Sequence, residues 1–101
     1  MDKEILAITQ QIIEKYSPEK VILFGSAARG DAEADSDVDF LIVKKYAPHY
    51  GADRIRELSR IIKRNIAVDF LIYRPEELER RLQMGDPFLK AILKEGRVLH
   101  G

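Results

Sequence analysis

The chain contains no cysteine among its 101 residues. A disulfide scaffold and thiolate-bound zinc are therefore excluded, and the absence fits a reducing cytoplasm. Net charge is also absent, because 17 Lys and Arg residues balance 17 Asp and Glu residues. No strong global field draws such a chain to nucleic acid or to an anionic membrane, so any specificity of that kind has to come from a local site.

Long apolar runs are missing as well. The N-terminal stretch MDKEILAITQQIIEKY carries acidic residues early and has no long apolar core, so it reads as neither a signal peptide nor a membrane span. We expect a cytoplasmic protein that forms a single domain over residues 1–101 and does not engage a membrane. A chain of this size can form one core but has little material for a separate substrate-binding module. A large substrate must therefore be held partly by another molecule.

Strands and helices alternate along the chain. Asp2 can cap a first helix whose apolar residues recur at helical spacing, and Ser17-Pro18 ends it. Capping, proline and periodicity signals predict further helices, and apolar runs predict strands. The predicted strands are 20–24, 38–43 and 67–73, and the further helices are 27–29, 53–64, 75–82 and one from Asp86-Pro87 to Gly96. This alternation predicts an α/β fold with a small mixed β-sheet flanked by helices.

Two acidic residues stand at the mouth of an apolar strand. They are Asp37 and Asp39, in the stretch LFGSAARGDAEADSDVDFLIV. The pentapeptide VDFLI of this strand recurs at residues 68–72, after the predicted helix. If the two strands are parallel neighbours in matched register, Asp39 and Asp69 lie side by side, about 5 Å apart. The strand pleat points Asp37 to the same face as Asp39, so three carboxylates converge.

Converging carboxylates repel one another, and a bound divalent cation removes the conflict. Ligation by oxygen alone favours Mg²⁺ or Mn²⁺, and Mg²⁺ completes its shell with water and substrate phosphates. Gly25 and Ser26 fit a phosphate-bearing substrate, because glycine lets backbone amides approach an anion and the helix that follows offers its positive end. Arg29, about one turn further, can add a cationic clamp.

Each of these features also has a purely structural interpretation. Gly25-Ser26 can be an ordinary turn, Ser36 and Asp37 can be loop and cap residues, and Asp69 can form a salt bridge with an arginine. A run of basic residues in the predicted helix 53–64 is interpreted as a solvated face, with contact to RNA or a partner as the alternative. The basic residues are Arg54, Arg56, Arg60, Lys63 and Arg64, and Ile55, Leu58, Ile61 and Ile62 are expected to face inward.

The combination is much more specific than its parts. Gly25-Ser26, ten intervening residues, Asp37-Val38-Asp39 and a later strand with Asp69 resemble the nucleotidyltransferase superfamily typified by DNA polymerase beta. Within it, the short chain and the wording GSAARGDAEADSDVDF resemble the minimal nucleotidyltransferases, or MNT domains, over most of the chain. The resemblance implies a palm-like fold, triphosphate contacts at Gly25 and Ser26, and two Mg²⁺ ions held by the three aspartates. Arg29 and Ser36 complete the expected nucleotide-binding set.

The activity implied by the resemblance is transfer of a nucleoside monophosphate, AMP from ATP, to a hydroxyl group. Members of the family commonly act as antitoxins that modify a tyrosine of a small helical partner, a HEPN-type ribonuclease toxin. Two alternatives stay open. One is a non-catalytic antitoxin that neutralises its toxin by occlusion, and the other is an enzyme that acts on RNA ends or a small molecule. Direct nucleic-acid binding is not decided by the sequence.

Overall fold

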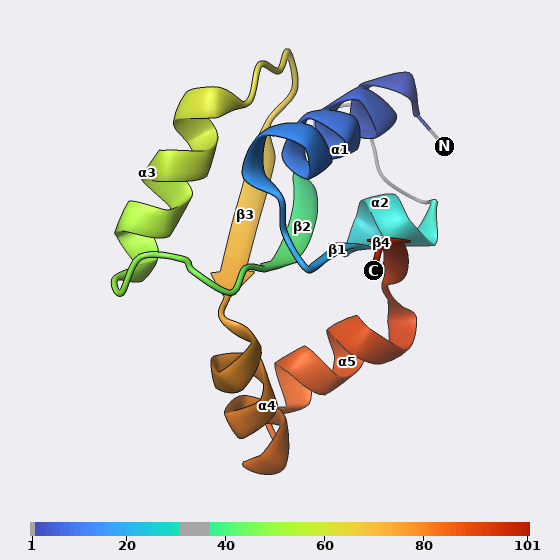
Figure 1. The fold of residues 1–101 in the computed structure, drawn as a ribbon. Helices are drawn as coiled ribbons and strands as arrows, with labels where there is room; N and C mark the ends of the chain where they lie inside the picture. The colour runs from blue at the N-terminus through green and yellow to red at the C-terminus, as the bar shows by residue number, and fades with distance from the viewer. Residues whose placement is uncertain (1, 31–36) are drawn as a thin grey trace.

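The computed structural model describes residues 2–30 and 37–101. Helices and strands alternate in the order that the sequence predicts, with one additional strand near residue 100 (Figure 1). The elements are α1 (Lys3–Tyr16), β1 (Lys20–Phe24), α2 (Ser26–Arg29), β2 (Val38–Val43), α3 (Gly51–Ile61), β3 (Val68–Tyr73), α4 (Pro75–Gln83), α5 (Pro87–Glu95) and β4 (Arg97–His100).

The strands form one mixed sheet in the order β3-β2-β1-β4. Strand β1 is antiparallel to both of its neighbours, β2 and β4, whereas β2 and β3 are parallel. The register between β2 and β3 aligns the two VDFLI segments residue for residue, from Val38 beside Val68 onwards. The predicted mixed α/β sheet and the matched register are thus both confirmed.

Both faces of the sheet are covered, which explains why its central strands are apolar on both sides. Side chains that point alternately up and down from each strand contribute to two separate cores. On one face, α1 and α3 pack against Leu23, Phe40 and Phe70 in the larger core. On the other face, α4 and α5 pack against Ile22 and Leu41 in the smaller core.

Helix α5 approaches the sheet closely because it ends at Gly96. A β-carbon added at this position would lie 2.5 Å from the carbonyl oxygen of Ile92 and 2.7 Å from Cγ2 of Ile22. Only glycine fits in this space. The last turn of α5 is thereby held directly against β1, with Leu89 and Ile92 buried beneath the helix.

Helix α1 begins and ends as the sequence predicts. The side chain of Asp2 accepts a hydrogen bond of 2.7 Å from the Glu4 amide at the N-cap, and Ser17 ends the helix in the left-handed conformation. At that end, Tyr16 is only 4% exposed. Within the described part of the chain its hydroxyl group has no hydrogen-bond partner, and burial, the largest cause, raises the pKa of Tyr16 to about 12.

Helix α3 differs from the prediction in three ways. It spans Gly51–Ile61 instead of 53–64, and Ile55, expected to face inward, is 43% exposed. The third difference is Arg54, which was assigned to a solvated basic face but is only 4% exposed. The interpretation of a solvated face is therefore wrong for Arg54, although Arg56, Arg60 and Lys63 are exposed.

Arg54 is buried because its guanidinium group is fully occupied by oxygen acceptors. It donates to both carboxylate oxygens of Glu77, at 2.6 and 3.1 Å. It also donates to the backbone carbonyls of Pro48, His49 and Ile72. Five acceptors match the five donors of a guanidinium. Arg54 thereby joins the loop before α3, the end of β3 and the start of α4.

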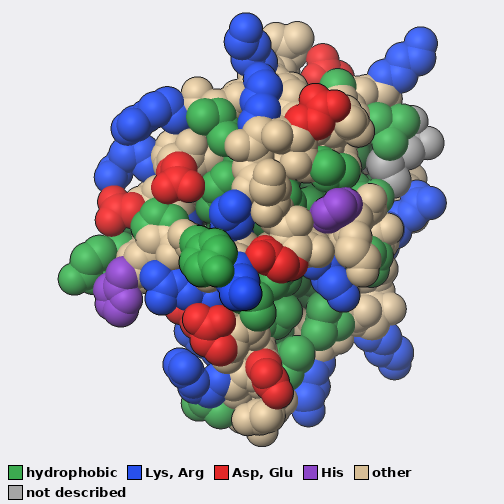
Figure 2. Space-filling view, in the orientation of Figure 1, with side chains coloured by type: hydrophobic (Ala, Val, Ile, Leu, Met, Phe, Trp, Pro, Cys, Tyr) green, Lys and Arg blue, Asp and Glu red, His purple; other side chains and the backbone are tan. Residues whose placement is uncertain are grey.

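Basic and acidic side chains are interspersed over the surface that Figure 2 shows, as the balanced composition leads one to expect. Among the described residues, no helix is both long enough and apolar enough to cross a membrane.

Candidate active site

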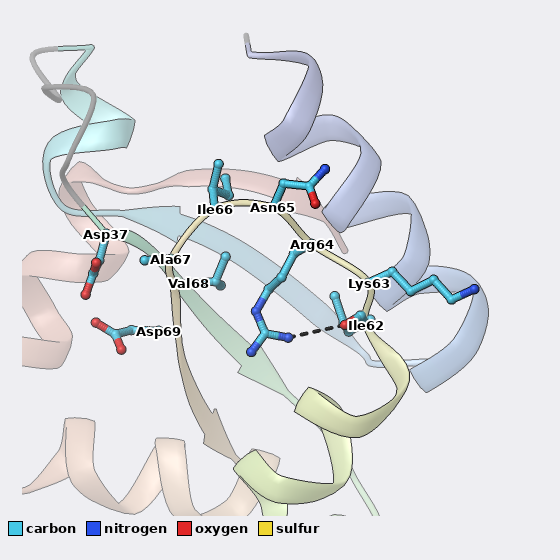
Figure 3. A pocket seen from close by; sticks show the side chains of 9 residues that line it. All are labelled: Asp37, Ile62, Lys63, Arg64, Asn65, Ile66, Ala67, Val68 and Asp69. Atoms are coloured by element: carbon cyan, nitrogen blue, oxygen red, sulfur yellow. Dashed lines mark hydrogen bonds between the residues drawn. The ribbon is translucent and has the colours of Figure 1, made fainter.

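The predicted carboxylates meet at one end of the sheet. Asp39 of β2 is the register partner of Asp69 on β3 and, on its other side, of Phe24 on β1. Asp39 and Asp69 therefore form a row of carboxylates beside Phe24, on the face of the sheet that carries α4 and α5. Asp37 precedes β2 by one residue, and its carboxylate faces that of Asp69 (Figure 3). The predicted alignment of Asp39 with Asp69 is thus confirmed, and Asp37 lies at the same end of the sheet.

The electrostatics of the row follow from its geometry. Burial, then the charges of Asp69 and Asp37, raise the pKa of Asp39. Asp69 is solvent-exposed as a residue, yet partial desolvation, the charge of Asp37 and a hydrogen bond to its carboxyl group raise its pKa too. The close approach of the three carboxylates therefore favours the uncharged form of Asp39 and Asp69.

Gly25 closes the site on the side of β1. Its backbone angles are φ 73° and ψ −156°, a combination that essentially only glycine adopts. A β-carbon at this position would lie 2.5 Å from Oδ2 of Asp39. The backbone of residue 25 and the carboxylate of residue 39 are therefore in direct contact. Ser26 follows as the first residue of α2, whose first amides have no partner inside the helix.

Two hollows flank the row of carboxylates. The first, of about 760 Å³, is open and lies between Asp37, Asp69 and the loop from Ile62 to Ala67. Figure 3 shows Arg64 extending along this hollow, where it donates a hydrogen bond to the Ile62 carbonyl, while Lys63 points away from the carboxylates. The second, of about 310 Å³, lies on the other side, where Gly25 and Asp39 face α5.

The donor set is suited to a divalent cation, since carboxylate oxygens are the ligands of Mg²⁺ and Mn²⁺. Burial and then mutual repulsion raise the pKa values of Asp39 and Asp69, and such an ion would relieve the repulsion. Among residues 2–30 and 37–101, no group of three acidic, histidine or cysteine side chains is already arranged as a finished metal centre. The residues fit the ion in chemistry, and binding would have to draw them together.

The remaining predicted residues are placed as follows. Arg29, the last residue of α2, lines the second hollow together with Gly25 and Asp39. Ser36 lies outside the described residues. The sequence did not lead us to expect that one face of α5 lines the second hollow. The helical spacing of Phe88, Ala91 and Glu95, which places all three on that face, could have indicated it.

Known proteins resemble the chain over nearly its whole length. The sequence profile of the nucleotidyltransferase domain matches residues 5–100. A protein of Methanocaldococcus jannaschii named "putative protein adenylyltransferase" is 32% identical over 101 residues, which are 98% of this chain and 97% of that protein. A second protein of that name from the same organism is 49% identical over 51 residues, which are 50% of this chain and 46% of its own length.

A crystal structure of a "putative nucleotidyltransferase" from Sulfolobus solfataricus is 29% identical to this chain. It covers 79% of this chain and 81% of its own, with a TM-score of 0.49. The assignment itself rests on the profile and on the first relative, which span the sheet, the Gly25 turn and all three aspartates. By these matches the chain belongs to the nucleotidyltransferase domain family and is an enzyme of that class.

Proposed function

We propose that this protein transfers AMP from ATP to a hydroxyl group on a partner protein. The observation that carries the proposal is the contact between Gly25 and Asp39, the register partner of Asp69. It places a turn that is suited to phosphate beside carboxylates that are suited to metal ions. The protein acceptor is supported by the relatives, which are named as protein adenylyltransferases.

In this proposal the residues of the turn bind the triphosphate. Gly25 brings its backbone close to the phosphates, and Ser26 offers its amide and hydroxyl group as donors. Arg29 and Ser36 add a cation and a further donor beside the same phosphates. Together these groups orient the α-phosphorus toward Asp69, so that the acceptor oxygen can approach in line with the departing pyrophosphate.

The three aspartates would hold divalent ions, Mg²⁺ or Mn²⁺, with Asp37 and Asp39 nearest the phosphates and Asp69 nearest the acceptor. When bound, the ions would neutralise the triphosphate and lower the pKa of the acceptor hydroxyl. Asp69 would accept the hydroxyl proton, because it lies nearest the acceptor. A bond forms between the acceptor oxygen and the α-phosphorus, the bond from that phosphorus to the bridging oxygen breaks, and pyrophosphate leaves.

The acceptor has to come from another molecule. Asp69 lies beside the open hollow and is solvent-exposed, so a side chain of a second protein can reach it. The resemblance to MNT domains favours a tyrosine of a helical HEPN-type toxin, which the modification would silence in the cytoplasm. The chain would then act as an antitoxin.

Intact-mass spectrometry tests the proposal. The protein is incubated with a helical HEPN-type protein as the candidate partner, ATP and Mg²⁺, and we expect the intact mass of the partner to rise by whole AMP units. Asp37→Asn, Asp39→Asn and Asp69→Asn should each suppress the gain strongly, and two changes together should cost little more than one, because the carboxylates act as a unit. Arg56→Gln, on the exposed surface, is the matched control.

Two outcomes would contradict the proposal. If the partner stays unmodified but is inhibited equally by the wild type and all three variants, neutralisation occurs by occlusion. If RNA gains AMP instead of the partner, the acceptor is a nucleic-acid end.

A further inference from the structure

The second hollow beside the carboxylates has two walls of different character. Phe24, Gly25 and Asp39 form the wall on the sheet. Phe88, Ala91 and Glu95 belong to the facing wall, which is one side of α5. With about 310 Å³ the hollow is at the lower end of the range for small-molecule sites.

The wall on α5 places an aromatic ring and a carboxylate two turns apart. Phe88 and Glu95 are seven residues apart and therefore share a helix face, with about 10 Å between their positions along the axis. Ala91 lies between them, and its small side chain leaves the middle of the wall open. The ring of Phe88 meets that of Phe24 edge to face, with 6.0 Å between centroids and 85° between planes. Phe24 thus fixes the position of Phe88 although the latter is 55% exposed.

We propose that this hollow holds the adenine base of the nucleotide. This inference rests on the proposed function, since it starts from phosphates at Gly25 and Asp39. These two residues line the same hollow as Phe88 and Glu95, so a nucleotide with its phosphates at the turn has its base within reach of α5.

The chemistry of the wall matches that of the base. A purine presents flat apolar faces, which pack against aromatic rings. Its edge carries the exocyclic 6-amino group, which is a hydrogen-bond donor. A carboxylate is an acceptor only. Glu95 therefore accepts from the amino group and rejects a base whose edge carries an oxygen or nothing at that position, while Phe88 contacts the ring whichever base is present.

Binding of two probes separates the base from the phosphates. Affinities for ATP and for inorganic tripolyphosphate are measured by calorimetry with Mg²⁺. Ala91→Phe fills the open part of the wall, so ATP should bind at least tenfold more weakly while tripolyphosphate binds as before. Lys94→Phe adds the same ring to the same helix outside the hollow and should bind both probes as the wild type does.

Base recognition is tested by comparing ATP with purine riboside triphosphate, which lacks only the 6-amino group. The wild type should prefer ATP by about tenfold, as expected for one hydrogen bond to a charged acceptor. Glu95→Ala should bind the two nucleotides equally. This variant alters an exposed helix position, so its fold is not at risk if Ala91→Phe proves unstable.

The results also separate this inference from the proposed function. ATP affinities that are unchanged in Ala91→Phe and Glu95→Ala, but lost in Asp39→Asn, would overturn the base site and leave the proposed transfer reaction standing. A wild-type protein that binds neither ATP nor tripolyphosphate would overturn both. Equal wild-type affinities for ATP and purine riboside triphosphate would remove the role of Glu95.

Discussion

The carboxylate of Asp39 occupies the place that a side chain at position 25 would need. With 2.5 Å between an ideal β-carbon of residue 25 and Oδ2 of Asp39, no residue larger than glycine fits without displacing the carboxylate. The backbone angles of Gly25 impose the same requirement independently. The turn at Gly25 and the carboxylate of Asp39 therefore form one structural unit, and a substitution at either position disturbs the other.

We expect Gly25→Ala to abolish nucleotidyl transfer, because the new methyl group pushes the Asp39 carboxylate out of its row. The strained backbone should also lower the free energy of unfolding by about 1–3 kcal/mol. Gly30→Ala is the matched control, since Gly30 also has a positive φ, of 76°, but its β-carbon would meet no atom within 4 Å. It should lose about 1–2 kcal/mol of stability and keep ATP binding. Calorimetric ATP affinities that fall equally in both variants would show that backbone strain, and not the contact with Asp39, is responsible.

We expect Asp39→Asn to stabilise the metal-free protein at neutral pH. Because the pKa of Asp39 is raised in the folded state, mainly by burial, the folded protein holds this proton more tightly than the unfolded chain does. The free energy of unfolding then falls as the pH rises above the ordinary carboxyl range near 3.8. The gain from Asn should thus be present at pH 7 and absent below about pH 4.

With Mg²⁺ and ATP added, the wild type should be more stable than Asp39→Asn. A ligand at 100 times its dissociation constant stabilises the wild type by about 2.7 kcal/mol, and the variant should gain much less. Thermal melting with and without the ligands measures both effects. A wild type and variant with the same ligand-induced shift would contradict the metal site.

We expect Arg54→Leu to destabilise the protein by about 3–5 kcal/mol. The change leaves the Glu77 carboxylate and three backbone carbonyls without their buried donor. Arg56→Leu is the control on the same helix, because its pair with Asp53 is exposed at 64% and 47% and should contribute less than about 1 kcal/mol. Denaturant unfolding compares the two. Equal losses would mean that Arg54 is not the connection between α3, β3 and α4.

The ion pair between Arg54 and Glu77 should also make the stability of the protein sensitive to acid. The hydrogen bond from Arg54, the largest cause, lowers the pKa of Glu77 from 4.5 to about 2. The ionised Glu77 therefore stabilises the fold fully above its pKa in the unfolded chain, which is 4.5, and this stabilisation is lost as the pH falls from 4.5 toward 2. Glu77→Gln should be less stable than the wild type at pH 7 and should lose less stability between pH 5 and pH 2. A steeper acid loss in the variant would contradict the assignment.

We expect Tyr16→Phe to leave stability unchanged or raise it by about 1 kcal/mol, because it removes a buried hydroxyl group that has no partner among the described residues. The variant should also lose one source of alkaline destabilisation. With a folded pKa of about 12, Tyr16 reduces the free energy of unfolding as the pH rises from 10 to 12. Chemical denaturation at pH 7 and pH 11 measures both. A clear loss of stability at pH 7 would show that water or another partner satisfies the hydroxyl.

The position of the carboxylates could be predicted because their pattern is local. The repeated VDFLI segments are apolar on both faces, so a shift by one residue would turn Asp39 or Asp69 into a core, and the matched register avoids this. Asp69 is not buried in this register, because strand β3 lies at the edge of the sheet and the Asp69 carboxylate reaches solvent.

Arg54 and β4 could not be predicted for a different reason. The acceptors of Arg54 are mostly backbone carbonyls, whose positions depend on how loop, strand and helix assemble and not on the side chains that the sequence spells out. Strand β4 has only four residues, RVLH, and no alternating pattern long enough to distinguish it from a loop. The end of α3 shifted because the buried Ile62 is extended and Arg64 donates to the carbonyls of Ser59 and Ile62.

The pairing of β1 with β4 has a consequence for synthesis on the ribosome. Val21 pairs with His100 and Ile22 with Val98, so roughly 70 residues have to be added after β1 before its second edge can be covered. At typical elongation rates this takes roughly 4–15 s. During that time the nascent chain presents an apolar strand with unpaired amides and carbonyls, which is a template for pairing with another chain. Aggregation of this protein during expression should therefore depend on how soon residues 97–100 are synthesised and pair with the free edge of β1.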